Sequence, residues 1–228
     1  MDIVFTNTSI IPEEMAPKPA SKFIPDWYKN LESYISGKKA PVGNGTADFT
    51  AKKCMPIFDA ITSGYIIVSP ADVYVSQQDG QAYFEWSGFD LISFHPKEQA
   101  IEHSYAKQSD AFPKWMNPWA IKTPKGYSTL FIPPMHRESV FSILPGVVDT
   151  DAYTAPVNFP FILNDPKFEG LIPAGTPIAQ VIPFKRESWE MKFGGEKELI
   201  EQQKAQIKLI TKFFDRYKSM FRQPKEYK

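Results

Sequence analysis

The side chains best placed for chemistry lie on a short acidic turn. Gly146-Val-Val-Asp149-Thr-Asp151-Ala-Tyr153 carries two carboxylates and a phenol between two apolar segments. A carboxylate that is held rigidly on a turn between strands can serve as a general base, and Asp149 is the candidate. The alternative is that Asp149 and Asp151 only cap the turn through hydrogen bonds between their side chains and the backbone.

The stretch from Gly146 to Arg186 resembles the third and fourth motifs of the dUTPase and dCTP-deaminase superfamily, in their usual order and at roughly their usual separation. The resemblance implies a β-clip or distorted-barrel core, with Asp149 as the base that activates water and Tyr153 packed against a sugar. The chain departs from the pattern at Ala152, an extra residue before the tyrosine. It is also similar to a family found in bacteria and tailed phages, and that likeness implies no particular activity.

A second segment of the resemblance is Gly175-Thr-Pro-Ile-Ala-Gln180, where the superfamily has Gly-Asp-Arg-Ile-Ala-Gln. The resemblance implies that Gln180 contacts phosphates. Thr176 and Pro177 replace the charged pair, and proline offers none of the planar donors that arginine supplies. The alternative for Gln180 is a buried amide that bonds to neighbouring backbone groups.

The place of the superfamily's second motif is held by residues 133–139, which keep a proline, an arginine and a serine in a different order. Arg137 and Ser139 would meet an anion if a helix began here. Glu138 would oppose such binding. We therefore treat Arg137 and Ser139 as ligand-binding candidates.

An aromatic segment, Trp115-Met-Asn-Pro-Trp119, could form a rigid wall for a flat or apolar ligand, with Trp119 as the candidate contact. The alternative is a small secondary core beneath a long loop. The three histidines, His95, His103 and His136, are scattered, and only His136 has a carboxylate, Glu138, in His-x-Glu spacing. We therefore expect no metal site and no cofactor, with Mg2+ involved only if a nucleotide is hydrolysed.

The fold class follows mainly from proline. The chain has 21 prolines, and those between Pro113 and Pro183 exclude long helices there and favour short strands joined by turns. Runs such as Tyr127–Ile132 and Ile178–Phe184 predict strands, and Asp79-Gly80 predicts a hairpin turn. We expect a mainly β protein, α+β at its edges, forming a single domain over 1–228. Its parts are an N-terminal arm and helix (1–50), a β core (51–190) and a C-terminal helix (191–228).

Two helices are expected outside the β core. Residues 22–36 predict a short N-terminal helix, because Trp27, Leu31 and Ile35 recur every four residues. Residues 196–221 contain no proline or glycine and predict a long amphipathic helix. Its apolar face comprises Ile200, Ile207, Ile210, Phe214, Tyr217 and Phe221. This helix would either pack across its own β domain or join subunits through a short coiled-coil seam.

The composition of the chain argues against two classes of binding partner, nucleic acid and membranes. Lysine plus arginine and aspartate plus glutamate each number 26, so no net field attracts nucleic acid or an anionic membrane. No apolar run is long enough to span a bilayer, the N-terminus does not have the pattern of a signal peptide, and Cys54 is the single cysteine. These features predict a cytoplasmic protein that binds neither nucleic acid nor membrane.

Two functions remain open. In the first, the chain is a dUTPase-like scaffold without catalysis, which binds a small molecule or a protein, for instance as a phage accessory component. In the second, it binds and hydrolyses a nucleotide as a pyrophosphatase, with Asp149 as the general base. The resemblance implies a homo-oligomer in either case, with a trimer as the first expectation.

Overall fold

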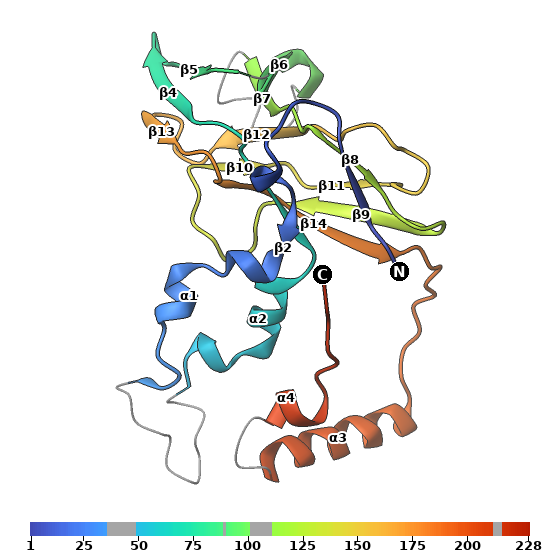
Figure 1. The fold of residues 1–228 in the computed structure, drawn as a ribbon. Coiled ribbons are helices and arrows are strands. Elements are labelled where there is room, and N and C mark those ends of the chain that lie inside the picture. The colour runs from blue at the N-terminus through green and yellow to red at the C-terminus, as the bar shows by residue number, and fades with distance from the viewer. Residues whose placement is uncertain (36–48, 89, 101–110, 212–215) are drawn as a thin grey trace.

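The computed structural model describes residues 1–35, 49–88, 90–100, 111–211 and 216–228 (Figure 1). It is mainly β, as predicted, with helices at one end of the molecule. The strands are β1 (Val4–Asn7), β2 (Lys18–Pro19), β3 (Tyr65–Val68), β4 (Val73–Gln78), β5 (Gln81–Trp86), β6 (Ile92–Pro96), β7 (Ala111–Trp115), β8 (Trp119–Lys122), β9 (Tyr127–Ile132), β10 (Phe141–Ile143), β11 (Gly146–Val148), β12 (Phe159–Leu163), β13 (Gly170–Ile172) and β14 (Pro177–Lys185). The α-helices are α1 (Asp26–Asn30), α2 (Met55–Thr62), α3 (Glu196–Thr211) and α4 (Arg216–Met220).

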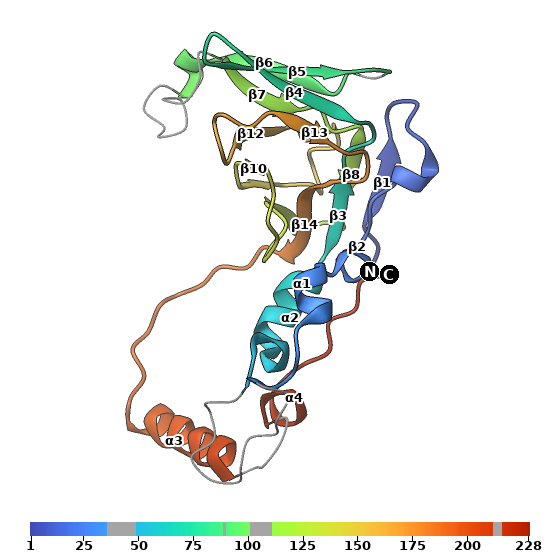
Figure 2. The same cartoon turned by 90° about the vertical axis from the view of Figure 1, so that its left-hand side faces the viewer.

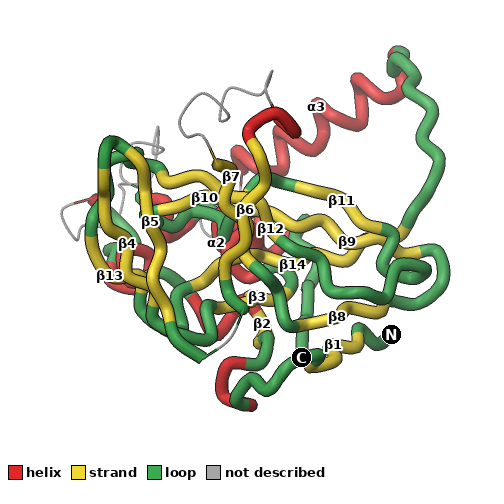
Figure 3. Tube along the Cα trace, turned by 90° about the horizontal axis from the view of Figure 1, so that it is seen from above, coloured by secondary structure: helices red, strands yellow, loops and turns green. Residues whose placement is uncertain are grey.

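The strands form several antiparallel sheets. The largest has the order β11-β9-β14-β3-β2, and β14 is its central strand, paired with β9 on one side and β3 on the other. The other sheets are β10-β12-β7-β6, β13-β4-β5 and the pair β1-β8. Figure 3 shows β1 and β8 side by side at the edge of the molecule. The N-terminal arm is therefore built into the β region at β1 and β2 instead of lying free.

The core lies between these sheets and is rich in rings. Trp115, Phe131 and Phe161 are among its largest fully buried side chains, and Trp115 stacks on Phe161 with a centroid distance of 5.2 Å. Strand β4 shows the period-2 pattern behind this burial, since Val73 and Val75 are fully buried and Tyr74 between them is half exposed. Trp115 and Trp119, at the two ends of the aromatic segment, belong to this main core and not to the small secondary core that was the expected alternative.

Turn and strand predictions agree closely with the structure. Asp79 and Gly80 have positive φ angles of 51° and 77°, and they join β4 to β5. β9 occupies the predicted residues, and β14 extends the predicted strand by one residue at each end. A short 3-10 helix follows β6 at Lys97–Ala100, and residues 101–110 lie outside the described part of the chain.

The predicted β core (51–190) begins with a helix instead of a strand, because α2 occupies Met55–Thr62. Pro56 lies in the first turn of α2, where a missing N–H costs nothing. The N-terminal helix is shorter than predicted. It ends at Asn30, and Leu31 has an extended backbone with φ −66° and ψ 129°.

The predicted C-terminal helix is found as α3 and α4, with residues 212–215, including the predicted contact Phe214, outside the described part. Figures 1 and 2 show that α3 lies apart from the sheets, at the end of an extended linker, so it does not pack across the β domain. After α4 the chain returns to the body. There Arg222 and Lys225 bind the Asp59 carboxylate of α2 at 2.7 and 2.9 Å, and Tyr65 donates to the Lys228 carbonyl at 3.3 Å. None of the helices in the described ranges has the length and apolar character that crossing a membrane requires.

Candidate functional site

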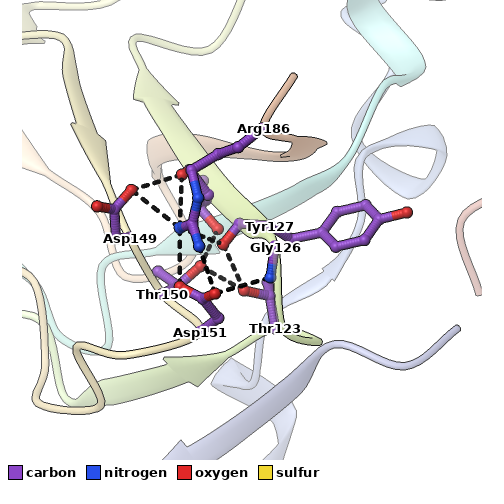
Figure 4. Close-up of polar contacts among 9 residues, drawn as sticks. Thr123, Gly126, Tyr127, Asp149, Thr150, Asp151 and Arg186 are labelled. Atoms are coloured by element: carbon purple, nitrogen blue, oxygen red, sulfur yellow. Dashed lines mark hydrogen bonds and ion pairs between the residues drawn. The ribbon is translucent and has the colours of Figure 1, made fainter. Parts of the chain in front are cut away.

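The acidic turn meets two strand ends in the largest sheet. β11 pairs with β9 so that Val148 lies opposite Thr129, and β14 pairs with β9 so that Lys185 lies opposite Tyr127. The residues that follow, Asp149 after β11 and Arg186 after β14, are therefore brought together at the start of β9. Figure 4 shows the resulting cluster of carboxylates, hydroxyls and one guanidinium.

Asp151 and Arg186 form the central ion pair. The Arg186 guanidinium donates to both carboxylate oxygens, from Nη1 at 2.8 Å and from Nη2 at 2.5 Å. The backbone N–H of Gly126 donates to the same carboxylate at 2.8 Å. The hydrogen bonds from Arg186 and then from Gly126 lower the pKa of Asp151 from 3.8 to about 2, so it is a carboxylate at neutral pH.

Asp149 is more open to solvent. Its Oδ1 accepts a hydrogen bond from the Ser128 hydroxyl at 2.6 Å and lies 3.1 Å from Arg186 Nη1. Its side chain is nevertheless 65% exposed, against 9% for Asp151. The Ser128 hydrogen bond, followed by the charge of Arg186, lowers the pKa of Asp149. The backbone carbonyl of Asp149 accepts N–H bonds from Ala152 and Tyr153, which closes the turn.

Buried hydroxyls lie behind the turn. Thr150 is fully buried, and its hydroxyl lies 2.8 Å from that of Thr123 and 2.7 Å from that of Thr129. The backbone N–H of Thr123 also donates to the Thr150 carbonyl at 3.2 Å. Because these polar atoms satisfy one another away from water, they hold the turn rigidly against β9.

Gln180 lies near the other end of β9, opposite Ile132. It is 1% exposed. Its Nε2 donates to the carbonyls of Ala60 and Ser63 at 2.9 and 2.7 Å, and its Oε1 accepts the N–H of Met135 at 2.9 Å. Both amide donors are thus used by backbone groups, so this side chain ties α2 and the segment after β9 to β14.

Arg137 lies near this end of β9, two residues beyond Met135. Its Nη2 donates to the Phe23 carbonyl, and its Nε is buried without a hydrogen-bond partner. Burial lowers the pKa of Arg137, opposed by the nearby charge of Asp26. The Ser139 hydroxyl, two residues further on, accepts a long 3.4 Å hydrogen bond from the Phe141 N–H. No helix begins at residues 133–139, so the expected helix N-terminus is absent from this described segment.

The remaining candidates lie elsewhere. Trp119 is 6% exposed and belongs to the core, where its N–H and carbonyl bond to the Asn117 side chain. Tyr153 is half exposed on the acidic turn. The structure thus brings Asp149 and Tyr153 together at one end of β9, and Gln180 and Arg137 together at the other.

A cavity of about 390 Å³ opens away from both groups. Its lining comprises Thr8, Ser9, Ile11, Pro70, Asp90, Leu91, Met116, Asn117, Pro118, Pro156 and Asn158. None of the six sequence candidates lines it. Among the described residues, no three His, Cys, Asp or Glu side chains are grouped as metal ligands, and His103 lies outside these residues.

Sequence reasoning missed Arg186, the only cation of the cluster in Figure 4. The sequence signal for Arg186 is weak: it lies two residues after the predicted strand Ile178–Phe184, and only the register of that strand against β9 brings it beside the acidic turn. No protein-family model and no curated protein matches this chain.

Proposed function

We propose that the protein is a non-catalytic binding scaffold with a dUTPase-like core, which takes a small molecule or a protein partner. The observation that carries this proposal is that backbone groups of the same chain occupy the side-chain amide of Gln180. A phosphate contact needs the amide N–H donors, and both already bond to the Ala60 and Ser63 carbonyls in a side chain that is 1% exposed. Releasing them would leave two partly buried carbonyls without this partner.

The acidic turn supports the same proposal. An efficient general base has a pKa near the working pH, because it must both take and release a proton. The pKa of Asp149 is lowered by Ser128 and Arg186 instead of raised. Arg186, the one cation in the cluster of Figure 4, already donates hydrogen bonds to both carboxylate oxygens of Asp151. This pairing is typical of a turn stabilised by charge.

The separation of the candidates adds a third argument. Asp149 bonds to Ser128, and Gln180 lies opposite Ile132, four residues further along β9. At roughly 3.3 Å per residue this is about 13 Å. A base at one end and phosphate ligands at the other do not form one compact site within a single chain.

The test is a thermal-shift screen of the purified chain against nucleoside mono-, di- and triphosphates with Mg2+, followed by a pyrophosphate-release assay. A ligand that binds the folded state must raise the melting temperature. The scaffold proposal expects no turnover and the same response from wild type and Asp149→Asn. Turnover that Asp149→Asn abolishes would overturn it.

A nucleotide pyrophosphatase is the second candidate, favoured by the exposure of Asp149. At 65% exposure, this carboxylate on a rigid turn is open to water and to another molecule. A catalytic site would then combine the acidic turn of one copy with the Arg137 end of another, with Mg2+ carried by the substrate. Mixing inactive Asp149→Asn chains with inactive Arg137→Ala chains tests this arrangement, because mixed assemblies would contain some intact sites and regain turnover.

A further inference from the structure

The segment between β14 and the end of α3 stands out from the body. We call residues 187–211 the C-terminal arm; it comprises the linker 187–195 and α3. The body holds the chain immediately before the arm, where Arg186 pairs with Asp151, and again after it, where Arg222 pairs with Asp59. Figures 1 and 2 show the arm projecting between these two attachments, away from the sheets.

The linker exposes three large apolar side chains. Trp189, Met191 and Phe193 are 88%, 82% and 93% exposed, and they alternate with Glu190 and Lys192. Glu190 and Lys192 pair with each other at 3.1 Å. An extended segment with this period presents its rings on one side and its charges on the other. A tryptophan and a phenylalanine exposed in one short segment mark a contact surface, because aromatic anchors dominate protein interfaces.

Helix α3 continues the exposed surface. Leu199 and Ile200 are 53% and 43% exposed, and they lie within the first two turns after the linker. The linker and this helix face therefore offer apolar area on consecutive parts of the arm. Glu198 fixes the start of the helix, since its carboxylate accepts the Gly195 N–H at 2.8 Å.

The distribution of charged residues along α3 indicates which kind of molecule the arm binds. Its first half carries Glu196, Glu198 and Glu201 with a single lysine, and its second half carries Lys204 and Lys208 with no acidic residue. Two such helices attract each other side by side only when antiparallel, because the parallel arrangement sets like charges together. This pattern is complementary to itself under a two-fold rotation, as an interface between identical subunits requires.

We propose that the C-terminal arm binds a second copy of this chain. The two α3 helices pair antiparallel across a two-fold axis. In this arrangement Trp189, Met191 and Phe193 of each copy lie at the C-terminal end of the other copy's α3. The pairing is independent of the proposed binding function and of the acidic turn.

The apolar surface area of the C-terminal arm is large enough for such a pairing. A standard interface buries about 800 Å² on each partner. Burying one tryptophan and one phenylalanine supplies about 300–500 Å² of this. The apolar face of α3, with Met191, would supply the remainder. The arm thus carries enough surface for a stable dimer without any contribution from the sheets.

The experiment is a mass measurement by light scattering after size exclusion, over a wide concentration range. We expect wild type at twice the 26.0 kDa chain mass. The triple variant W189S/M191S/F193S should be monomeric, with an unchanged circular dichroism spectrum because all three side chains are exposed. Ile10→Ser is the matched control, since Ile10 is 90% exposed at the opposite end of the chain, and it should leave the dimer intact.

A charge swap tests whether the charges of α3 drive the pairing. E196K/E201K and K204E/K208E should each be monomeric alone, because each makes α3 predominantly one sign and self-repelling. Mixed together they should form a heterodimer. Glu198 is kept in both variants because it binds the Gly195 N–H. A monomeric wild type, a threefold mass, a triple variant that still dimerises, or a mixture that stays monomeric would each overturn the proposal.

Discussion

The two ends of β9 use their polar side chains in opposite ways. At the Ile132 end, Gln180 is buried and its amide bonds to three backbone groups of its own chain. At the Tyr127 end, Asp149 is largely exposed, and only Oδ1 is held, by Ser128 and Arg186. One end is closed by tertiary packing, and the other keeps a carboxylate in contact with solvent.

This difference separates two kinds of contribution. Groups at the Gln180 end stabilise the fold, so changing them should alter the free energy of unfolding. At the other end Asp149 faces outward, so changing it should alter binding or the pH dependence of stability more than stability at neutral pH. The following substitutions test that contrast.

The largest effect is expected from Gly64→Ala, beside the Gln180 end. Gly64 has a φ of 73°, and an added Cβ would lie 2.0 Å from the Val181 carbonyl oxygen. We expect a loss of roughly 4 kcal/mol in the free energy of unfolding, measured by chemical denaturation. Gly126→Ala is the control at the Asp149 end, because its φ is 86° but no atom lies within 4 Å of the added Cβ. It should cost only about 1 kcal/mol. Equal losses would contradict the steric argument.

Gln180→Leu is expected to have the next largest effect. The substitution keeps apolar volume but leaves the Ala60 and Ser63 carbonyls and the Met135 N–H without their partner. We expect a loss of roughly 3 kcal/mol, again from denaturation. Gln77→Leu is the matched control, since Gln77 also donates to two carbonyls, of Pro166 and Phe168, but is only half-buried. A comparable loss at position 77 would show that burial does not set the cost.

Asp151→Asn should change how stability responds to acid. The folded pKa of Asp151 lies at about 2, below its ordinary value of 3.8. Its ion pair therefore stabilises the fold above pH 3.8, and that contribution is lost as the pH falls toward 2. Asp59, whose pKa is also lowered by Arg222, adds to the same acid loss. We expect the melting temperature of Asp151→Asn to fall less steeply below pH 4 than that of wild type. Parallel curves would exclude Asp151 as a source of the acid sensitivity.

The smallest effect on stability is expected from Asp149→Asn. An asparagine oxygen can still accept the Ser128 hydroxyl bond, and the side chain is largely exposed. Its melting temperature at neutral pH should stay within error of wild type and above that of Asp151→Asn. A larger loss than at position 151 would show that the exposed carboxylate is structural, which would reverse the contrast between the two ends.

Local patterns predicted much of the β region. The Asp79-Gly80 turn and the strands β9 and β14 depend on neighbouring residues, and all three were found at or within one residue of the predicted positions. α2 was missed because its eight residues lie within a proline-containing apolar stretch that also suits a strand. The position of α3 was not predictable from its sequence pattern. An amphipathic pattern indicates that one face of a helix is packed against something, but it does not indicate which surface that is.

The candidate site was predictable only in part. The acidic turn was recognised from residue types, whereas its pairing with Arg186 depends on the register of β14 against β9, which no local pattern reports. Gln180 fits its buried-amide alternative, but its three partners come from α2 and two loops distant in sequence. Long-range contacts of this kind follow from the folded topology.

The return of the chain after α4 makes the C-terminal tail a separately held piece. Arg222 and Lys225 form ion pairs with Asp59, and the rings of Tyr227 and Tyr65 pack with their centroids 5.8 Å apart. A protease cutting the exposed linker, for instance after Lys192, would therefore cut the backbone without releasing the fragment that follows. The nicked molecule would persist as a two-piece complex held by the Asp59 ion pairs and the Tyr65–Tyr227 ring contact until the body unfolds.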